Sequence, residues 1–348
     1  MPRRPALKLP LILLMSPILS GCYLLQAAQG QMQIVARREP IPELLADPAT
    51  PEALRKRLDY VAAAREFASR ELGLPDNESY RSYADVGRPF VVWNVFATPE
   101  FSVEPRRWCF PIAGCVVYRG YFNEERAQDY ARGLRLRGDD TVVGGVAAYS
   151  TLGHFKDPVL NTMIGWNDAQ LAATLFHELA HQVAYVPGDS EFNEAFATVV
   201  EENGLTRWLI SRGSEADLRT WQVQREQYAQ FVELLLETRE RLAALYRLDL
   251  PVDEKRTRKQ QEFARLKMQY AELRRRWNGY SGYDSWFSRT LNNAHLVSAA
   301  TYHGCVPAFE RLLAEADNEL PRFYERVREL ATRATKEGSA VMCRQASS

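Results

Sequence analysis

The residues with the clearest chemical potential lie in the segment His177-Glu178-Leu179-Ala180-His181. In a helix, the two histidines stand one turn apart on one face, so both imidazoles can reach a single cation at about 2 Å. Glu178 is rotated by about 100° from His177, which is too far for a third ligand but close enough to touch a water on the metal. The spacing therefore predicts two metal ligands, His177 and His181, and a general base, Glu178. The alternative is a pair of helix histidines that only make structural hydrogen bonds.

A catalytic zinc site also needs a third protein ligand and an open coordination position. After a Pro187-Gly188 break, a second predicted helix begins near Glu191 and can point the carboxylate of Glu194 at the cation. Glu201 and Glu202 follow on the same helix and are competing candidates, and the residues alone leave this choice open.

Further groups are expected to support the metal site from outside. Thr198 and Glu201 lie four and seven residues after Glu194, so they share its helical face and can orient the imidazoles. A surface carboxylate is the alternative for Glu201. Tyr302 is a candidate donor to the tetrahedral intermediate of peptide hydrolysis, and a buried core tyrosine is the alternative.

Two groups of zinc peptidases share these motifs. His177 to His181 with Asn193-Glu194 resembles the gluzincin metallopeptidases, and 193–197 is similar to the NEGFA segment of the large zinc aminopeptidases. The resemblance implies one Zn²⁺ ion with Glu194 as its third ligand. The spacing departs from the pattern, because twelve residues separate His181 from Glu194 where gluzincins usually have eighteen or nineteen. It further implies that Gly145 and Val146 lie on an edge strand that binds the substrate backbone, with a core strand as the alternative.

A closer resemblance covers nearly all of the chain after residue 22 and is to an aminopeptidase family of bacterial lipoproteins. It implies a zinc-dependent aminopeptidase that acts on peptides. The matching segments are Tyr23…Gln26-Ala27-Ala28…Gly30-Gln31, Trp108-Cys109-Phe110-Pro111-Ile112…Gly114, Tyr118…Gly120-Tyr121-Phe122, Ala148-Tyr149-Ser150-Thr151-Leu152-Gly153…Asp157-Pro158, Phe176 to Gln182, Phe192-Asn193-Glu194, Asn292-Asn293-Ala294 and Val306-Pro307-Ala308-Phe309.

The elements that must position these residues form a mainly helical α+β fold, in which a small β-sheet packs on a zincin-like helical domain with a long helical hairpin. The zinc motif lies in a helix predicted over 168–185, with Asp168 as its N-cap. We expect a single metallopeptidase domain over 22–335. Its predicted parts are a helical segment at 23–82, a sheet-rich part at 83–150 with one helix near 123–137, the zinc-site helices at 165–212, the hairpin at 215–277 and two helices at 285–335 joined near 304–307; a tail follows at 336–348.

The first 21 residues are typical of an export signal. Arg3, Arg4 and Lys8 precede an apolar stretch, and Leu19-Ser20-Gly21-Cys22 resembles the bacterial lipoprotein box. The resemblance implies a lipid on Cys22 that anchors the protein in the cell envelope, and Tyr23 in place of an Asp favours the outer membrane facing the periplasm. An ordinary secretory signal with a chance cysteine is the alternative.

The other four cysteines are predicted to form two structural disulfides, because an exported protein meets an oxidising compartment. Cys109 and Cys115 enclose a short turn and form the natural local pair, which leaves Cys305 to pair with Cys343.

The amino-acid composition limits the classes of partner that the chain is expected to bind. The chain has 348 residues, 46% hydrophobic, and its 44 basic and 44 acidic residues give no net charge, so we expect no nucleic-acid partner. The charged hairpin at 215–277 is most simply a solvated surface, although it could bind a protein partner. Two alternatives to an aminopeptidase remain: an envelope endopeptidase, and a non-catalytic envelope scaffold.

Overall fold

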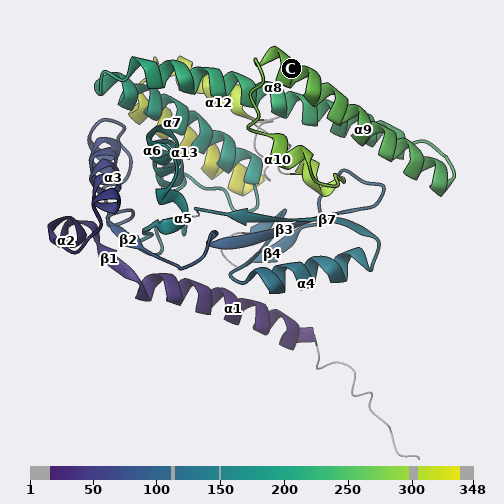
Figure 1. Cartoon of the computed structure of the whole chain (residues 1–348), viewed down its shortest axis with the longest axis horizontal. Helices are drawn as coiled ribbons and strands as arrows, with labels where there is room; N and C mark the ends of the chain where they lie inside the picture. The colour runs from purple at the N-terminus through teal and green to yellow at the C-terminus, as the bar shows by residue number, and fades with distance from the viewer. Residues whose placement is uncertain (1–15, 111–113, 149, 298–304, 338–348) are drawn as a thin grey trace, which may run out of the picture.

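The computed structural model describes residues 16–110, 114–148, 150–297 and 305–337 (Figure 1). Most of these residues are helical, and the strands gather in small sheets, so the expected α+β, mainly helical class is confirmed. The helices are α1 (Ser16–Ala36), α2 (Ile41–Ala46), α3 (Glu52–Arg70), α4 (Glu124–Arg135), α5 (Asn161–Ile164), α6 (Asp168–Ala180), α7 (Ser190–Ser211), α8 (Glu215–Tyr246), α9 (Val252–Arg276), α10 (Asp284–Phe287), α12 (Val306–Glu315) and α13 (Leu320–Glu337).

The strands form three small sheets where one small sheet was expected. An antiparallel sheet has the order β6 (Arg119–Tyr121), β3 (Val92–Pro99), β7 (Asp139–Val146). A second sheet joins β1 (Arg38–Pro40), β2 (Ser82–Ala84) and β8 (Val159–Leu160), so the segment 23–82 is not wholly helical. A hairpin of β4 (Trp108–Phe110) and β5 (Gly114–Val116) makes the third, and a disulfide joins Cys109 to Cys115 across it.

The main core lies where α6 and α7 pack on each other and on α3, α12 and α13. Phe176 on α6 and Phe196 on α7 are fully buried in it, and Phe196 lies against Phe309 and Phe323 from the C-terminal helices. Burying apolar side chains is the main stabilising contribution to a fold. The two helices that carry the zinc motif and Glu194 are therefore held in the most deeply buried part of the protein.

The helix predicted over 168–185, which carries the predicted zinc ligands, is shorter in the structure. Its N-cap is Asn167, whose side chain accepts a hydrogen bond from the backbone N–H of Gln170, so Asp168 is the first helical residue and not the cap. The helix ends at Ala180, because the next residues turn more tightly: the N–H groups of Gln182 and Val183 bond to carbonyls three residues earlier. His181 is consequently the C-cap of α6.

The hairpin of α8 and α9 is confirmed, with the break at Asp249-Leu250-Pro251, and lies above the β3–β7 sheet in Figure 1. Buried ionic contacts join it to the sheet. Lys259 donates to Asp140 (2.6 Å) and to the carbonyl of Glu100 (2.9 Å). Asn293 accepts a hydrogen bond from the hydroxyl of Tyr246 on α8 (2.8 Å) and donates to the carbonyls of Glu100 and Ser102. The Asn292-Asn293-Ala294 motif therefore secures the hairpin, at a distance from the zinc motif in the sequence.

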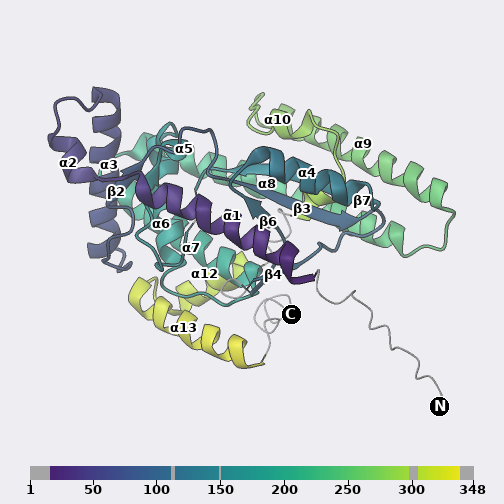
Figure 2. The same cartoon turned by 90° about the horizontal axis from the view of Figure 1, so that it is seen from below.

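The N-terminal helix α1 lies along the lower face of the molecule, beneath the sheet (Figures 1 and 2). The amide of Gln26 donates to the carbonyl of Gly120 and accepts from the N–H of Phe122, so it covers the open edge of β6. Gly30 faces the Phe122 ring so closely that a Cβ would lie 2.0 Å from Cγ. These contacts give a structural role to Gln26 and Gly30, which belong to one of the segments that resemble the aminopeptidase family.

The C-terminal part differs from the prediction of two helices. In the described residues, α10 spans only Asp284–Phe287, and the break between α12 and α13 falls at 316–319, where Asp317 and Asn318 adopt positive φ. Residues 298–304 lie outside the described residues, so the join expected near 304–307 is not described in full. Among the residues that were described, no helix has the length and apolar character needed to cross a bilayer.

Candidate metal centre

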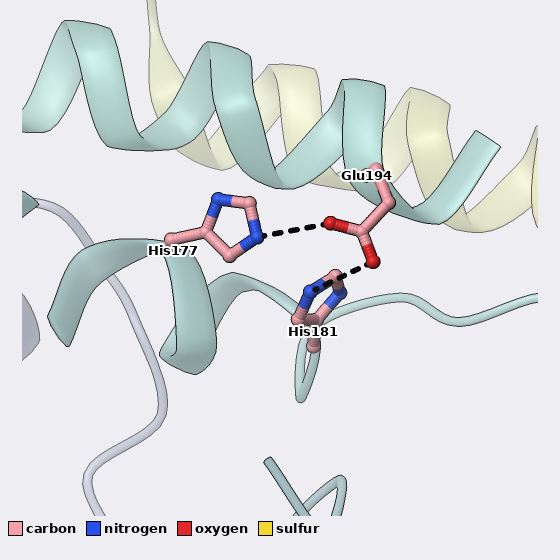
Figure 3. Close-up of side chains that lie close together, drawn as sticks. All are labelled: His177, His181 and Glu194. Atoms are coloured by element: carbon pink, nitrogen blue, oxygen red, sulfur yellow. Dashed lines mark hydrogen bonds and ion pairs between the residues drawn. The ribbon is translucent and has the colours of Figure 1, made fainter. Parts of the chain in front are cut away.

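Three side chains converge at the contact between α6 and α7 (Figure 3). One possible ligand atom from each of His177, His181 and Glu194 lies within 4.8 Å of the other two, so the group could hold a metal ion. Glu194 Oε2 is 3.3 Å from His177 Nε2, and Glu194 Oε1 is 3.9 Å from His181 Nε2. Figure 3 shows the carboxylate reaching from α7 towards both imidazoles.

The spacing and the donor types suit zinc. Two ligands of a tetrahedral zinc ion lie about 3.3 Å apart when each metal–ligand bond is about 2.0–2.1 Å. The distance from Glu194 to His177 equals that separation, and the distance to His181 needs only a small inward movement. Nδ1 of His181 is buried without a hydrogen-bond partner among the described residues, so this ring is not placed there by internal hydrogen bonding. The three residues therefore fit a metal ion.

The short linker between the two helices is fixed by the residue next to the ligand. The amide of Asn193 donates to the carbonyl of Val186 (2.9 Å) and accepts from the N–H of Val186 (2.7 Å). Asp189 caps α7 by accepting from the N–H of Phe192. A compact linker held in this way brings Glu194 to the histidines despite the short sequence separation.

Glu201 approaches the opposite side of His177. Its Oε2 is 2.9 Å from His177 Nδ1, seven residues along α7 from Glu194. Glu201 is therefore placed as a partner of an imidazole, while Glu194 faces both rings. Thr198, between them on the same helix, is buried and lines the cavity described below. Its supporting role stays a prediction.

The protonation states follow from burial and from the neighbouring carboxylates. Burial alone would lower the pKa of His177, but its hydrogen bonds to Glu194 and Glu201 raise that pKa well above the usual value. Burial lowers the pKa of His181 to about 4, with Glu194 opposing the shift and His177 adding to it. His181 is therefore neutral near pH 7, as a metal ligand must be. A cation facing His177 Nε2 would favour the neutral form of this ring as well, with Nδ1–H donating to Glu201.

Glu178 points into the same cavity as the metal group. Burial raises its pKa to about 7, the positive charge on His177 opposes the shift, and Glu194 reinforces it. A carboxyl group whose pKa lies near neutrality can both accept and return a proton. A nearby dication would lower that pKa and favour the carboxylate.

The cavity has a volume of about 890 Å³, and His177, His181 and Glu194 are among the residues that line it. Its walls come from α1, the β6–β3 face, the segment 146–152 and the hairpin helix α8. Sequence reasoning missed several of its polar lining residues, since no local motif marks them and all but Tyr185 lie far from His177–His181 along the chain. They are Asn94, Tyr118, Tyr185, Gln224, Arg225 and Tyr228.

Three of these are tyrosines whose hydroxyl groups stay protonated. Burial raises the pKa of Tyr228 to about 12, and the charges of Glu201 and Glu194 reinforce the shift. Burial and Glu194 also raise the pKa of Tyr185, and burial raises that of Tyr118 still further. These tyrosines can therefore act as hydrogen-bond donors at neutral pH.

The remaining predicted residues fall in different places. Val146 lines the cavity near the end of the edge strand β7, but Gly145 does not, because the Phe90 ring occupies the space beside its Cα. The missing Cβ of Gly145 makes room for Phe90, and the substrate-binding role expected for Gly145 and Val146 on this edge strand stays a prediction. Tyr302 and Cys343 lie outside the described residues, so their roles stay predictions. Cys305 is buried. The side chain of Cys22 is likewise not described.

The comparisons with known proteins concern the whole chain. No curated protein and no solved structure matches the chain. A family model described as "Putative aminopeptidase" matches residues 22–342, which include the three possible metal ligands, Glu178 and nearly every wall of the cavity. Peptides are the substrates that this family implies. The match covers most of the 348 residues, and the chain therefore belongs to this aminopeptidase family.

Proposed function

We propose that the protein is a zinc-dependent aminopeptidase in which His177, His181 and Glu194 hold one Zn²⁺ ion. The observation that carries the proposal is the convergence of these three side chains within 4.8 Å inside a cavity of about 890 Å³. A structural zinc site is normally closed by four protein ligands, whereas a three-ligand site beside a cavity leaves room for water and substrate.

A few residues share the proposed steps of peptide hydrolysis. Zinc, when bound, supplies a Lewis acid that acidifies water and polarises the scissile carbonyl. Glu178 accepts a proton from the attacking water and delivers it to the leaving amine. Glu201 holds the Nδ1–H of His177 and so fixes the orientation of that imidazole. Negative charge that develops on the carbonyl oxygen is stabilised by a hydroxyl donor, for which Tyr228 and Tyr185 are the candidates among the described lining residues.

One observation favours an endopeptidase as the second candidate. An aminopeptidase commonly needs an anionic group to bind the free amine of its substrate. Among the described residues that line the cavity, the acids are Glu178, Glu194 and Glu201, and the proposed mechanism already uses all three. Aminoacyl fluorogenic substrates compared with internally quenched peptides separate the two activities.

The proposed location is the bacterial cell envelope, with a lipid on Cys22 as anchor and the outer membrane facing the periplasm as the site. The order of basic residues, apolar stretch and Leu19-Ser20-Gly21-Cys22 supports this proposal. Labelling with a radioactive fatty acid, compared between the natural chain and Cys22→Ser, tests the anchor separately from the enzyme activity.

The decisive test of the function combines metal removal with a change of the base. The purified protein should contain about one zinc per chain, lose peptide hydrolysis with a chelator and regain it with zinc. Glu178→Gln should keep the zinc and lower kcat by at least about 10²-fold, because general-base catalysis contributes about 10²–10⁴-fold. Stoichiometric metal with no hydrolysis of any peptide by the natural chain would instead favour the scaffold alternative.

A further inference from the structure

We propose that α1 lies on the surface of a lipid bilayer, with Leu24, Leu25 and Met32 in contact with lipid, and that the catalytic cavity is thereby held beside the membrane. This orientation goes beyond a lipid anchor alone, which would leave the protein free to tumble on its tether. The part that concerns the cavity rests on the proposed peptidase function, whereas the lipid contact does not.

The first observation is a group of exposed apolar side chains on a helix without charge, beside the exposed amides of Gln29 and Gln33. Leu24, Leu25 and Met32 are 49%, 59% and 60% exposed, so all three large apolar side chains are largely in contact with solvent. The sequence of α1 contains no acidic or basic residue. A charge-free helix with leucines directed to solvent is costly in water and suits the boundary between lipid headgroups and acyl chains.

The second observation is that the opposite face is fixed to the protein. Gln26, Gly30 and Ile34, spaced by four residues, are buried, and Gln26 and Gly30 make the contacts with β6 and Phe122 described above. The helix cannot rotate its leucines inward without breaking these contacts. Figure 2 shows α1 running across the lower face of the molecule. The exposed face therefore stays directed outward.

The position of Leu24 and Leu25 in the sequence indicates that a lipid bilayer covers this face of α1. Leu24 and Leu25 are the second and third residues after Cys22, which carries the proposed lipid. Acyl chains attached there would enter a bilayer within one helical turn of the exposed leucines, so no linker separates the anchor from the folded protein. The same bilayer that takes the acyl chains is then the nearest apolar phase for Leu24 and Leu25.

The inner face of α1 connects the membrane to the cavity. Tyr23 and Ala27 line the cavity, and the Tyr23 ring stacks on Phe110 (5.3 Å between ring centroids) beneath the guanidinium of Arg119. One end of the cavity is therefore built from the residue next to Cys22. Polypeptides held at the bilayer surface, such as lipid-linked or membrane-bound chains, are the substrates that reach this end most directly.

Vesicle flotation tests the lipid contact. The zinc-loaded mature chain carrying Cys22→Ser, so that no acyl chain contributes, is mixed with phosphatidylethanolamine and phosphatidylglycerol vesicles. We expect Leu24→Gln with Leu25→Gln to lower the partition coefficient by roughly tenfold or more. Leu248→Gln with Val252→Gln is the matched control, because these residues are 47% and 50% exposed but lie at the far turn of the hairpin. Equal loss in both variants, or in neither, would overturn the proposal.

A second measurement does not depend on weakening α1. Met32→Trp should be quenched by brominated lipids, and Leu248→Trp should not. Absence of quenching at position 32 would contradict the lipid contact. Concentration-dependent dimers that disappear on Leu24→Gln with Leu25→Gln would assign the face to a second copy of the chain and also overturn the proposal.

The position of the cavity is tested with one peptide in two forms, free and attached to a phospholipid in the vesicles. The vesicle-bound natural chain should cleave the lipid-attached form at least about tenfold faster, because the two are held at the same surface at raised effective concentration. Equal rates would reject the membrane-facing cavity. If neither form is cleaved while flotation and quenching behave as expected, the peptidase function fails and the lipid contact stands.

Discussion

At the scale of single residues, the two nitrogens of His177 have different partners. Nε2 faces Glu194 at 3.3 Å, and Nδ1 faces Glu201 at 2.9 Å. Without a metal, a protonated ring can donate to both carboxylates, in line with its raised pKa, whereas a neutral imidazole has only one N–H and needs a cation between Nε2 and Glu194. The arrangement is consistent when Nδ1–H donates to Glu201 and the Nε2 lone pair is directed at a metal ion.

Glu201→Gln tests the contribution of this contact. The amide keeps the shape of the side chain but removes the charge that polarises His177, so zinc affinity should fall by about 10–100-fold. Competition with a chromogenic chelator measures the affinity. Glu202→Gln is the matched control, because Glu202 is the neighbouring residue on α7 but pairs with Arg225. An unchanged affinity in Glu201→Gln would show that the contact does not support the ligand.

Sequence spacing was informative for this site only where one helix carried the residues. His177, Glu178 and His181 share one turn, so their mutual placement follows from helical geometry. The choice between Glu194 and Glu201 depended on how the linker folds, and the Asn193 contacts with Val186 that settle its shape could not be read from periodicity. Tyr228 reaches the cavity through the docking of a distant hairpin, which no local pattern specifies.

At the scale of elements, the sequence pattern predicted where most helices lie. The residue at which a helix begins or ends depended on individual hydrogen bonds. The predicted hairpin, α4 and α7 closely match their observed spans. The zinc helix ended five residues early because the chain tightens after Ala180, and its true cap is Asn167, which resembles Asp168 in capping ability. Short strands such as β1 and β2 were missed because three residues carry too little alternation to be recognised.

The docking of α1 is tested by two helical glycines that differ only in their surroundings. Gly30→Ala places a Cβ 2.0 Å from Phe122 Cγ, so the gain in helix propensity should be outweighed by overpacking and the protein should lose about 1–3 kcal/mol of stability. Gly133→Ala in α4 meets nothing within 4 Å and should gain about 0.5–1 kcal/mol. Denaturant unfolding measures both. A stabilised Gly30→Ala protein would show that α1 is not packed on Phe122.

At the scale of the whole molecule, the site depends on parts joined across long sequence separations. The hairpin supplies Tyr228 and Arg225 to the cavity and has its own apolar cluster, built on Phe231, Leu266 and Phe287. Its ionic anchor to the sheet passes through Lys259 and Asp140, both largely buried. Burying an ion pair contributes little net stability, but losing one partner is costly. The Lys259–Asp140 pair therefore determines the position of the hairpin on the sheet and adds little to the stability of the protein.

The pH dependence of stability should report the packing of the segment after α10 through His295. This buried side chain lies against Trp286, and Asn292 donates its backbone N–H to Nδ1. Burial, reinforced by the charge of Arg289, lowers the pKa of His295 to about 4 in the folded protein, below its unfolded value of about 6.5. Between these values the unfolded chain binds more protons than the folded one, so stability is complete above pH 6.5 and falls as the pH drops towards 4.

The contribution of His295 can be isolated by comparing the natural chain with His295→Asn, which cannot titrate. Across this pH range the natural chain should lose up to about 3 kcal/mol more stability than the variant, since one pKa unit corresponds to about 1.4 kcal/mol. Urea unfolding at several pH values, with zinc removed from both proteins, provides the measurement. Zinc removal is needed because His181 also titrates near pH 4 and its protonation would release the metal. Parallel pH profiles for the two proteins would mean that His295 is accessible to protons in the folded state.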